Sequence, residues 1–175
     1  MSGESHALPD PGSGLLALYD RALPQVYGYL VTRCGGTPLA EDLTAEVFLA
    51  AVDAVRREPP VDISVPWLIG VARHKLADHW RRQAREERRL GAVADTAPAA
   101  VDPWDAELNA VRARGTLDKL APHHRGALIL RYVDDLPVPE VANLLDRTIH
   151  STEGLLVRAR AAFRRAYAEE EGGDV

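Results

Sequence analysis

The stretch AEDLTAEVFLAAVDAV, residues 40–55, decides the fold of this chain. Its apolar residues recur every four positions, which is the spacing of one buried helix face. These residues are Leu43, Val47, Ala51 and Val55. Just before the stretch, Thr37 predicts a helix N-cap and Pro38 fits the first turn, where its missing N–H is not needed. Taken alone, the stretch is better interpreted as an ordinary amphipathic core helix.

The segments on either side also predict helices. A helix from about Gly14 is expected to end at Gly35-Gly36, with Pro24 either kinking it or starting a second segment. Ser64 or Val65 is expected to cap a helix that continues to about Leu90. Four shorter helices are expected further on, over residues 104–120, 123–133, 139–145 and about 151–167. No strand-like alternation stands out, so the sequence predicts an all-α fold.

Composition divides the chain into two parts. Residues 91–103 are rich in Ala, Asp and Pro and cannot bury a core, so they predict a flexible acidic linker. Residues 1–13 predict a disordered leader and residues 169–175 an acidic tail. We therefore expect two small helical domains, 14–90 and 104–168, joined by the linker.

The charge of the chain is segregated. The net charge is −5, which on average disfavours nucleic acid binding. Residues 73–89, however, carry seven Lys/Arg and three acids, and residues 154–167 carry four arginines and no acid. Two basic helices separated by an acidic connector suggest two contacts with one polyanion.

Several classes of site are absent from the sequence. Cys34 is the only cysteine, which excludes an internal disulfide and a cysteine-cluster zinc site. His123 and His124 are adjacent on a predicted helix and would point about 100° apart, which disfavours a shared metal ion. Because no phosphate-binding glycine loop or nucleophile elbow occurs, we expect no cofactor, no metal and no catalysis. No apolar run reaches the roughly 18 residues of a membrane span and no signal peptide is recognisable, so a cytoplasmic protein is expected.

Three segments resemble one family. Residues 40–55 resemble the helix by which bacterial sigma factors of the extracytoplasmic-function type, in the sigma-70 family, grip the RNA polymerase clamp. PWLIGVARHKLADHWRR, residues 66–82, resembles their segment that melts and captures the −10 promoter element. Residues 117–167 have the layout of a helix-turn-helix and resemble the family's −35 reading domain. The resemblance covers roughly residues 15–167.

The resemblance implies a region 2 bundle, a region 4 helix-turn-helix and three sets of contact residues. Core RNA polymerase would be bound by Asp42, Leu43, Glu46 and Leu49. The loop from Glu58 to Ser64 would pocket a base flipped out of the −10 element. The full −10 set is Asp62, Ile63, Ser64, Arg73, His74, Lys75, His79, Arg81 and Arg82. The −35 set is Arg125, His150, Ser151, Glu153, Gly154, Arg158, Arg160 and Arg164. The implied partners are core RNA polymerase, promoter DNA and an anti-sigma factor.

The chain departs from the family pattern at a few of these positions. His74 stands where Asn is common and Ala45 where Gln is common. Glu153 occupies a usually basic position, where it would repel phosphate but could accept a hydrogen bond from a cytosine N4 amino group. We therefore expect an unusual or weakened −35 preference. Asp146 stands where Gly is common in the turn, and Asp tolerates left-handed backbone better than most residues.

Two other functions remain open from the sequence. A free-standing helix-turn-helix regulator would bind palindromic sites as a dimer, with half-sites about one helical turn apart. A degenerate sigma-like interaction protein would bind polymerase without reading a promoter. A salt series distinguishes the last alternative from the other functions, because contacts with phosphates make DNA affinity fall steeply as the salt concentration rises.

Overall fold

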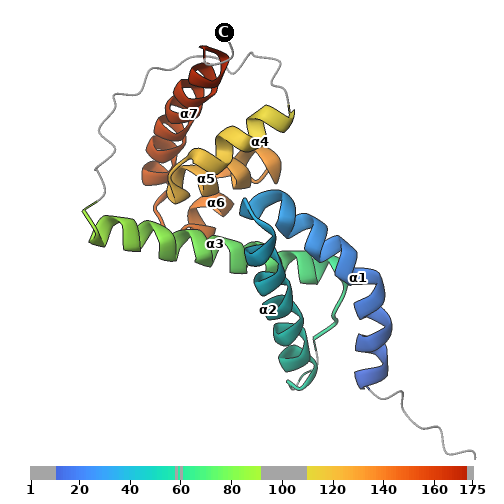
Figure 1. Ribbon diagram of the computed structural model, residues 1–175. Coiled ribbons are helices and arrows are strands. Elements are labelled where there is room, and N and C mark those ends of the chain that lie inside the picture. Colours follow the sequence, from blue (N-terminus) through green and yellow to red (C-terminus); the bar gives the residue numbers. More distant parts are fainter. Residues whose placement is uncertain (1–10, 58, 60, 92–109, 173–175) are drawn as a thin grey trace, which may run out of the picture. The chain divides into compact units, whose positions relative to one another are not determined.

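The computed structural model describes residues 11–57, 59, 61–91 and 110–172. Its helices, in chain order, are α1 (Pro11–Cys34), α2 (Thr37–Val55), α3 (Val65–Arg89), α4 (Ala110–Lys119), α5 (Pro122–Leu128), the π-helix η1 (Ile129–Val133), α6 (Val138–Leu144) and α7 (Ile149–Gly172) (Figure 1). These residues contain no strand, and the predicted all-α fold is confirmed. Residues 92–103 of the predicted linker, most of the leader and the last three residues lie outside the described part.

The chain forms two compact units, Met1–Leu76 and Ala77–Val175. α3 is continuous and contributes its first half to one unit and its second half to the other. The domain limits expected from composition, 14–90 and 104–168, stay a prediction.

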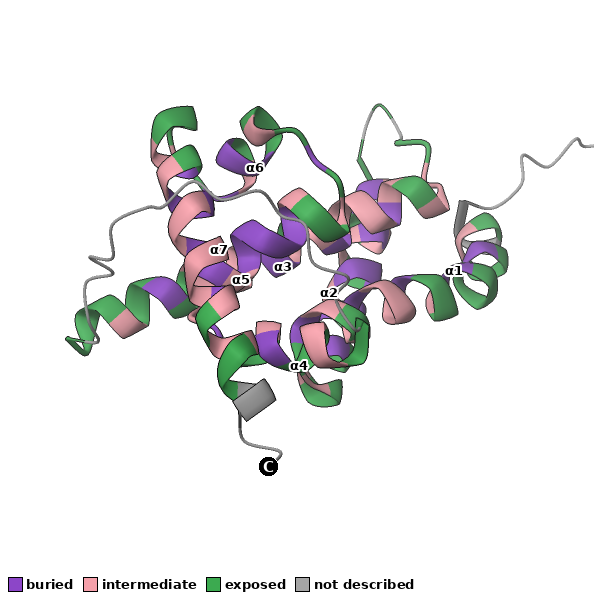
Figure 2. Ribbon diagram, turned by 90° about the horizontal axis from the view of Figure 1, so that it is seen from above, coloured by how far each residue is buried: buried purple, intermediate pink, exposed green. Residues whose placement is uncertain are grey.

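The first unit is built on α1 packed along α2. The predicted stripe of α2 is confirmed at Leu43, Val47 and Ala51, which are buried, whereas Val55 is half-buried at the end of the helix. Buried residues alternate with intermediate and exposed ones along the helices, as the purple, pink and green segments of Figure 2 show. Each fully buried leucine stabilises the fold by about 1.5–3 kcal/mol relative to an exposed one.

The ends of α1 and α2 differ in part from expectation. α1 begins at Pro11, ahead of Gly14, and runs through Pro24 without starting a second helix. It ends before Gly35, whose φ of 74° needs a residue without a Cβ. The prediction of Thr37 as N-cap is wrong: Gly36 is the N-cap in extended backbone with no side-chain cap hydrogen bond, and Thr37 is already helical.

The second unit is organised by α7, which packs against α4, α5 and α6. Its core cluster consists of Leu120, Leu128, Ala159 and Phe163. The predicted buried stripe of the last helix is confirmed at Leu156, Ala159 and Phe163, and Ala166 is half-buried. The predicted helix over 123–133 is divided into α5 and η1, and α7 extends beyond Tyr167 to Gly172.

The turn between α6 and α7 has a left-handed residue, as expected. Asp146 has a φ of 53°. The Asp146 N–H donates to the Asn143 carbonyl at 3.2 Å and the Arg147 N–H donates to the Ala142 carbonyl at 2.9 Å. This pair of bonds is the Schellman motif, which satisfies the last carbonyls of α6.

Gly126 in α5 lies against the indole of Trp80, from the second half of α3. Trp80 is 1% exposed. A Cβ added at Gly126 would lie 2.8 Å from Trp80 Cε3 and 3.0 Å from Cδ2, closer than real Cβ contacts. The absence of a side chain at Gly126 therefore allows α5 to approach the ring.

We predict that Gly126→Ala destabilises the protein by about 1–3 kcal/mol, because the buried indole must shift. The matched control is Gly115→Ala in α4, where an added Cβ meets nothing within 4 Å. The control should raise stability by about 0.5–1 kcal/mol through its helix propensity. Urea unfolding followed by tryptophan fluorescence measures both, and equal effects of the two substitutions would contradict the packing argument.

Candidate nucleic-acid interface

The outer face of α2 carries three of the four residues expected to contact polymerase. Asp42 is exposed, Glu46 is half-buried and Leu49 is 64% exposed. Leu43 is 1% exposed and belongs to the core, so it supports this face from beneath. Tyr19 of α1, 40% exposed, contacts Phe48 edge-on with ring centroids 4.6 Å apart. An exposed apolar side chain bordered by carboxylates suits a partner with apolar and basic groups.

An ion pair joins two of the predicted contact sets. Lys75 Nζ of α3 lies 3.1 Å from Glu46 Oε2 of α2. Both side chains remain more than a third exposed, so the pair stabilises the fold by at most about 1 kcal/mol. The face of α2 that was predicted to contact polymerase and the basic face of α3 therefore meet at this pair.

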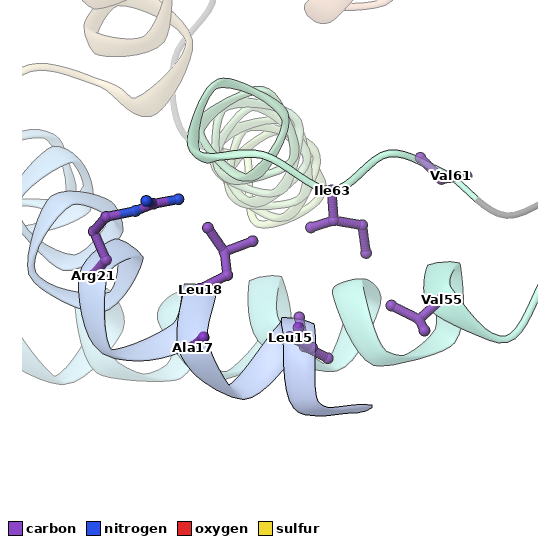
Figure 3. Close-up of a pocket in the computed structure, with 8 residues that line it drawn as sticks. Leu15, Ala17, Leu18, Arg21, Val55, Val61 and Ile63 are labelled. Atoms are coloured by element: carbon purple, nitrogen blue, oxygen red, sulfur yellow. The ribbon is translucent and has the colours of Figure 1, made fainter. Parts of the chain in front are cut away.

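The loop before α3 lies beside a cavity. Ser64 Oγ accepts the Trp67 N–H at 3.4 Å, which confirms the predicted cap of α3. Asp62 is exposed, Ile63 is half-buried, and Glu58 lies outside the described residues. The cavity is about 410 Å³ and its walls come from α1, the end of α2 and the loop (Figure 3).

The lining of this cavity is mostly apolar. Figure 3 shows Leu18 and Ile63 projecting into the space between α1 and the loop, with Val55 on α2 and Arg21 on α1 beside them. In the part of the chain that the structure describes, Arg21 is the only charged residue of the lining. Apolar walls with one guanidinium can accept a flat aromatic group that carries a hydrogen-bond acceptor.

The basic residues of α3 differ in their surroundings. His74 and Arg82 are exposed, and His74 Nδ1 lies 2.9 Å from the Gly70 carbonyl oxygen. Arg73 and His79 are half-buried. Arg81 is half-buried and donates to the Asp78 carboxylate. Within the predicted −10 set, His74 and Arg82 are therefore the α3 side chains most open to solvent.

The first turn of α7 is capped by a residue that sequence reasoning missed. Thr148 Oγ1 accepts the Ser151 N–H at 3.1 Å, and α7 begins at Ile149 rather than near Ser151. The buried hydroxyl of Thr152 donates to the Thr148 carbonyl at 2.9 Å. His150 and Glu153 are exposed one turn apart, so they share the accessible face at the start of the helix.

The arginines of the predicted −35 set have different roles. Arg158 lies over Gly154, because a Cβ added there would be 3.2 Å from Arg158 Nη1. Arg160 Nη1 donates to the Tyr132 hydroxyl at 3.1 Å. Arg164 is half-buried. Arg125 Nε donates to the Leu117 carbonyl at 2.9 Å, and this side chain connects α5 to the end of α4.

Arg147 is a further basic residue at this surface. Its Nη1 donates to Ser151 Oγ at 3.2 Å. Burial lowers the pKa of the Arg147 guanidinium, and the charges of Arg88 and then Arg158 lower it further. Arg147 remains protonated at all physiological pH values.

Comparisons with known proteins agree on one family. The Sigma-70 region 2 family matches residues 18–86. The chain is 32% identical over 156 residues to the sigma factor SigK of Mycolicibacterium vanbaalenii, covering 85% of this chain and 79% of that protein. It is 30% identical over 159 residues to BldN of Streptomyces coelicolor, covering 87% of this chain and 60% of BldN's length.

A solved structure shows a similar fold. The sigma factor RpoE of Bartonella quintana, in complex with the anti-sigma factor NepR, has a TM-score of 0.52 and 18% identity. The match covers 88% of this chain and 96% of that one. Among the described residues, no helix is long and apolar enough to cross a membrane.

The sequence relatives and the region 2 match together identify the family. This chain belongs to the extracytoplasmic-function RNA polymerase sigma factors of the sigma-70 family.

Proposed function

We propose that this chain is an alternative sigma factor that binds core RNA polymerase and directs initiation at promoters with −10 and −35 elements. The observation that carries the proposal is the start of α7. There the left-handed Asp146 and the threonine cap fix where α7 begins after α6. His150 and Glu153 are exposed on the first turn of α7. In helix-turn-helix proteins such a turn meets base edges in the major groove.

The −35 contact combines base reading with phosphate binding. Glu153 accepts a hydrogen bond from a cytosine N4 amino group, and the arginines around it neutralise phosphates. Arg158, folded over Gly154, supplies positive charge at the first turns of α7, where family members usually have a basic residue at position 153. Arg125 contributes mainly by holding α5 against α4.

The −10 contact uses the loop before α3 and the exposed basic face of that helix. The cavity beside Ile63 receives a flipped base between its apolar walls, and Arg21 offers a donor to it. His74 and Arg82 contact the DNA next to the loop, and Lys75 is held by Glu46 at the edge of this surface. Base flipping costs a few kcal/mol, which stacking and edge hydrogen bonds offset.

Polymerase binds the face of α2 that carries Asp42, Glu46 and Leu49. The protein itself performs no catalysis and acts in the cytoplasm, where polymerase and the chromosome lie. Family membership adds an anti-sigma factor as a partner that covers these surfaces until a signal releases it.

Leu49→Glu is predicted to weaken binding to core RNA polymerase by tenfold or more, because burying a leucine contributes about 1.5–3 kcal/mol. Leu90→Glu is the matched control: it makes the same change at a leucine that is 73% exposed just after α3. Affinities are measured by fluorescence titration of labelled chain with core enzyme. The proposal that α2 docks on polymerase is contradicted if the unchanged chain does not bind core enzyme. It is also contradicted if both variants lose the same amount of affinity for core enzyme.

Glu153→Lys is predicted to change the preferred −35 sequence, since a good base contact is worth about 1–3 kcal/mol of discrimination. Glu169→Lys, an exposed position near the other end of the same helix, repeats the charge change away from the first turn. Both variants are compared by selecting polymerase-bound DNA from a library randomised at the −35 element. A base-reading role for Glu153 is excluded if its substitution leaves the selected sequence unchanged.

A further inference from the structure

The second unit contains a cavity of about 390 Å³ that the proposed function does not use. It lies between the second half of α3 and the turn that leads into α7. Four arginines line it: Arg81, Arg85 and Arg88 from α3, and Arg147 from the turn. Trp80 and Leu155 form apolar parts of its wall.

The positive charges at this cavity are only partly balanced. Arg81 pairs with Asp78, and among the described residues that line the cavity Asp146 is the only acidic one. Arg88 uses its Nε to donate to the Ala84 carbonyl at 3.0 Å. The mutual repulsion of Arg147, Arg88 and Arg158 lowers the pKa of Arg147 beyond the effect of burial. Cations crowded around a cavity are stabilised when an anion enters it.

The groups around the cavity suit phosphate oxygens. Guanidinium groups bind phosphate through two parallel N–H donors. The hydroxyls of Thr148 and Ser151 also line the cavity, at the N-terminus of the long helix α7, whose dipole favours an anion. A volume near 390 Å³ is within the range of about 300–1,000 Å³ of small-molecule sites, and it is much larger than one phosphate needs.

We propose that this cavity binds a small molecule carrying two or more linked phosphate groups. Several arginines spread over one cavity match a chain of phosphates better than a single anion. The apolar wall at Trp80 can contact an attached organic group.

Binding there has a consequence that depends on the proposed function. Arg81 belongs to the predicted −10 set and Ser151 to the predicted −35 set, and both line the cavity. A bound phosphate compound therefore competes with promoter DNA for these side chains and lowers promoter affinity.

The test measures binding of inorganic pyrophosphate and triphosphate to the full chain by isothermal titration calorimetry, without DNA or polymerase. We expect saturable binding, with triphosphate at least tenfold tighter than orthophosphate. Arg147→Gln and Arg85→Gln should each weaken triphosphate binding at least tenfold, and Arg147→Lys should weaken it less. Arg114→Gln, at an exposed position on α4, is the control and should leave the affinity unchanged.

Thermal unfolding of each variant separates lost binding from lost structure, and the expected melting temperatures equal that of the unchanged chain. The proposal is overturned by no saturable triphosphate binding, or by equal losses in the Arg114 and Arg147 variants. It is also overturned if duplex DNA binding depends on Arg147 while triphosphate does not bind, because the arginines then serve DNA phosphates alone. None of these results bears on polymerase binding, which is measured separately.

Discussion

The backbone of the turn between α6 and α7 is the constraint on which the proposed −35 reading helix depends. Asp146 adopts a φ of 53°, which costs roughly 1–2 kcal/mol for a residue with a Cβ. The two Schellman hydrogen bonds that end α6 offset this cost, and Thr148 then caps α7. Because the end of one helix and the start of the next are fixed within a few residues, the direction of α7 relative to α6 is fixed too. The exposed first turn of α7 can then read base edges.

Charge is segregated in this acidic chain, which suits the proposed contact with DNA. The net charge of −5 keeps most of the surface repelled from a polyanion, whereas the basic residues gather on α3 and α7. Several of these cations are held by neighbours: Lys75 by Glu46, Arg81 by Asp78, and Arg160 by the Tyr132 hydroxyl. Such pairs restrict long side chains in advance, which would reduce the entropy lost in the proposed binding of DNA. They also explain why the exposed His74 and Arg82 stand out on α3.

Features governed by local periodicity and local backbone were predictable from the sequence. The buried face of α2, the Ser64 cap of α3 and the left-handed Asp146 follow from residues within a few positions of each other. The N-cap of α2 was wrong because Gly36 and Thr37 are both acceptable caps, and only the backbone angles decide between them.

Pairings between distant residues could not be read from the sequence. The contact of Arg160 with Tyr132 and that of Gly126 with Trp80 depend on how helices pack. The π-helix η1 was likewise missed, since its hydrogen-bond pattern leaves no clear signature in apolar spacing. For the same reason the arginine cavity was not foreseen, although each of its arginines was visible.

The most direct measurement mixes the purified chain with core RNA polymerase and fragmented genomic DNA and maps the 5′ ends of the transcripts. The account predicts starts that share a two-part upstream element and that disappear when the chain is omitted. Stable binding to core enzyme without any new starts would contradict promoter reading by α3 and α7. Absence of binding to core enzyme would contradict the sigma-factor account altogether.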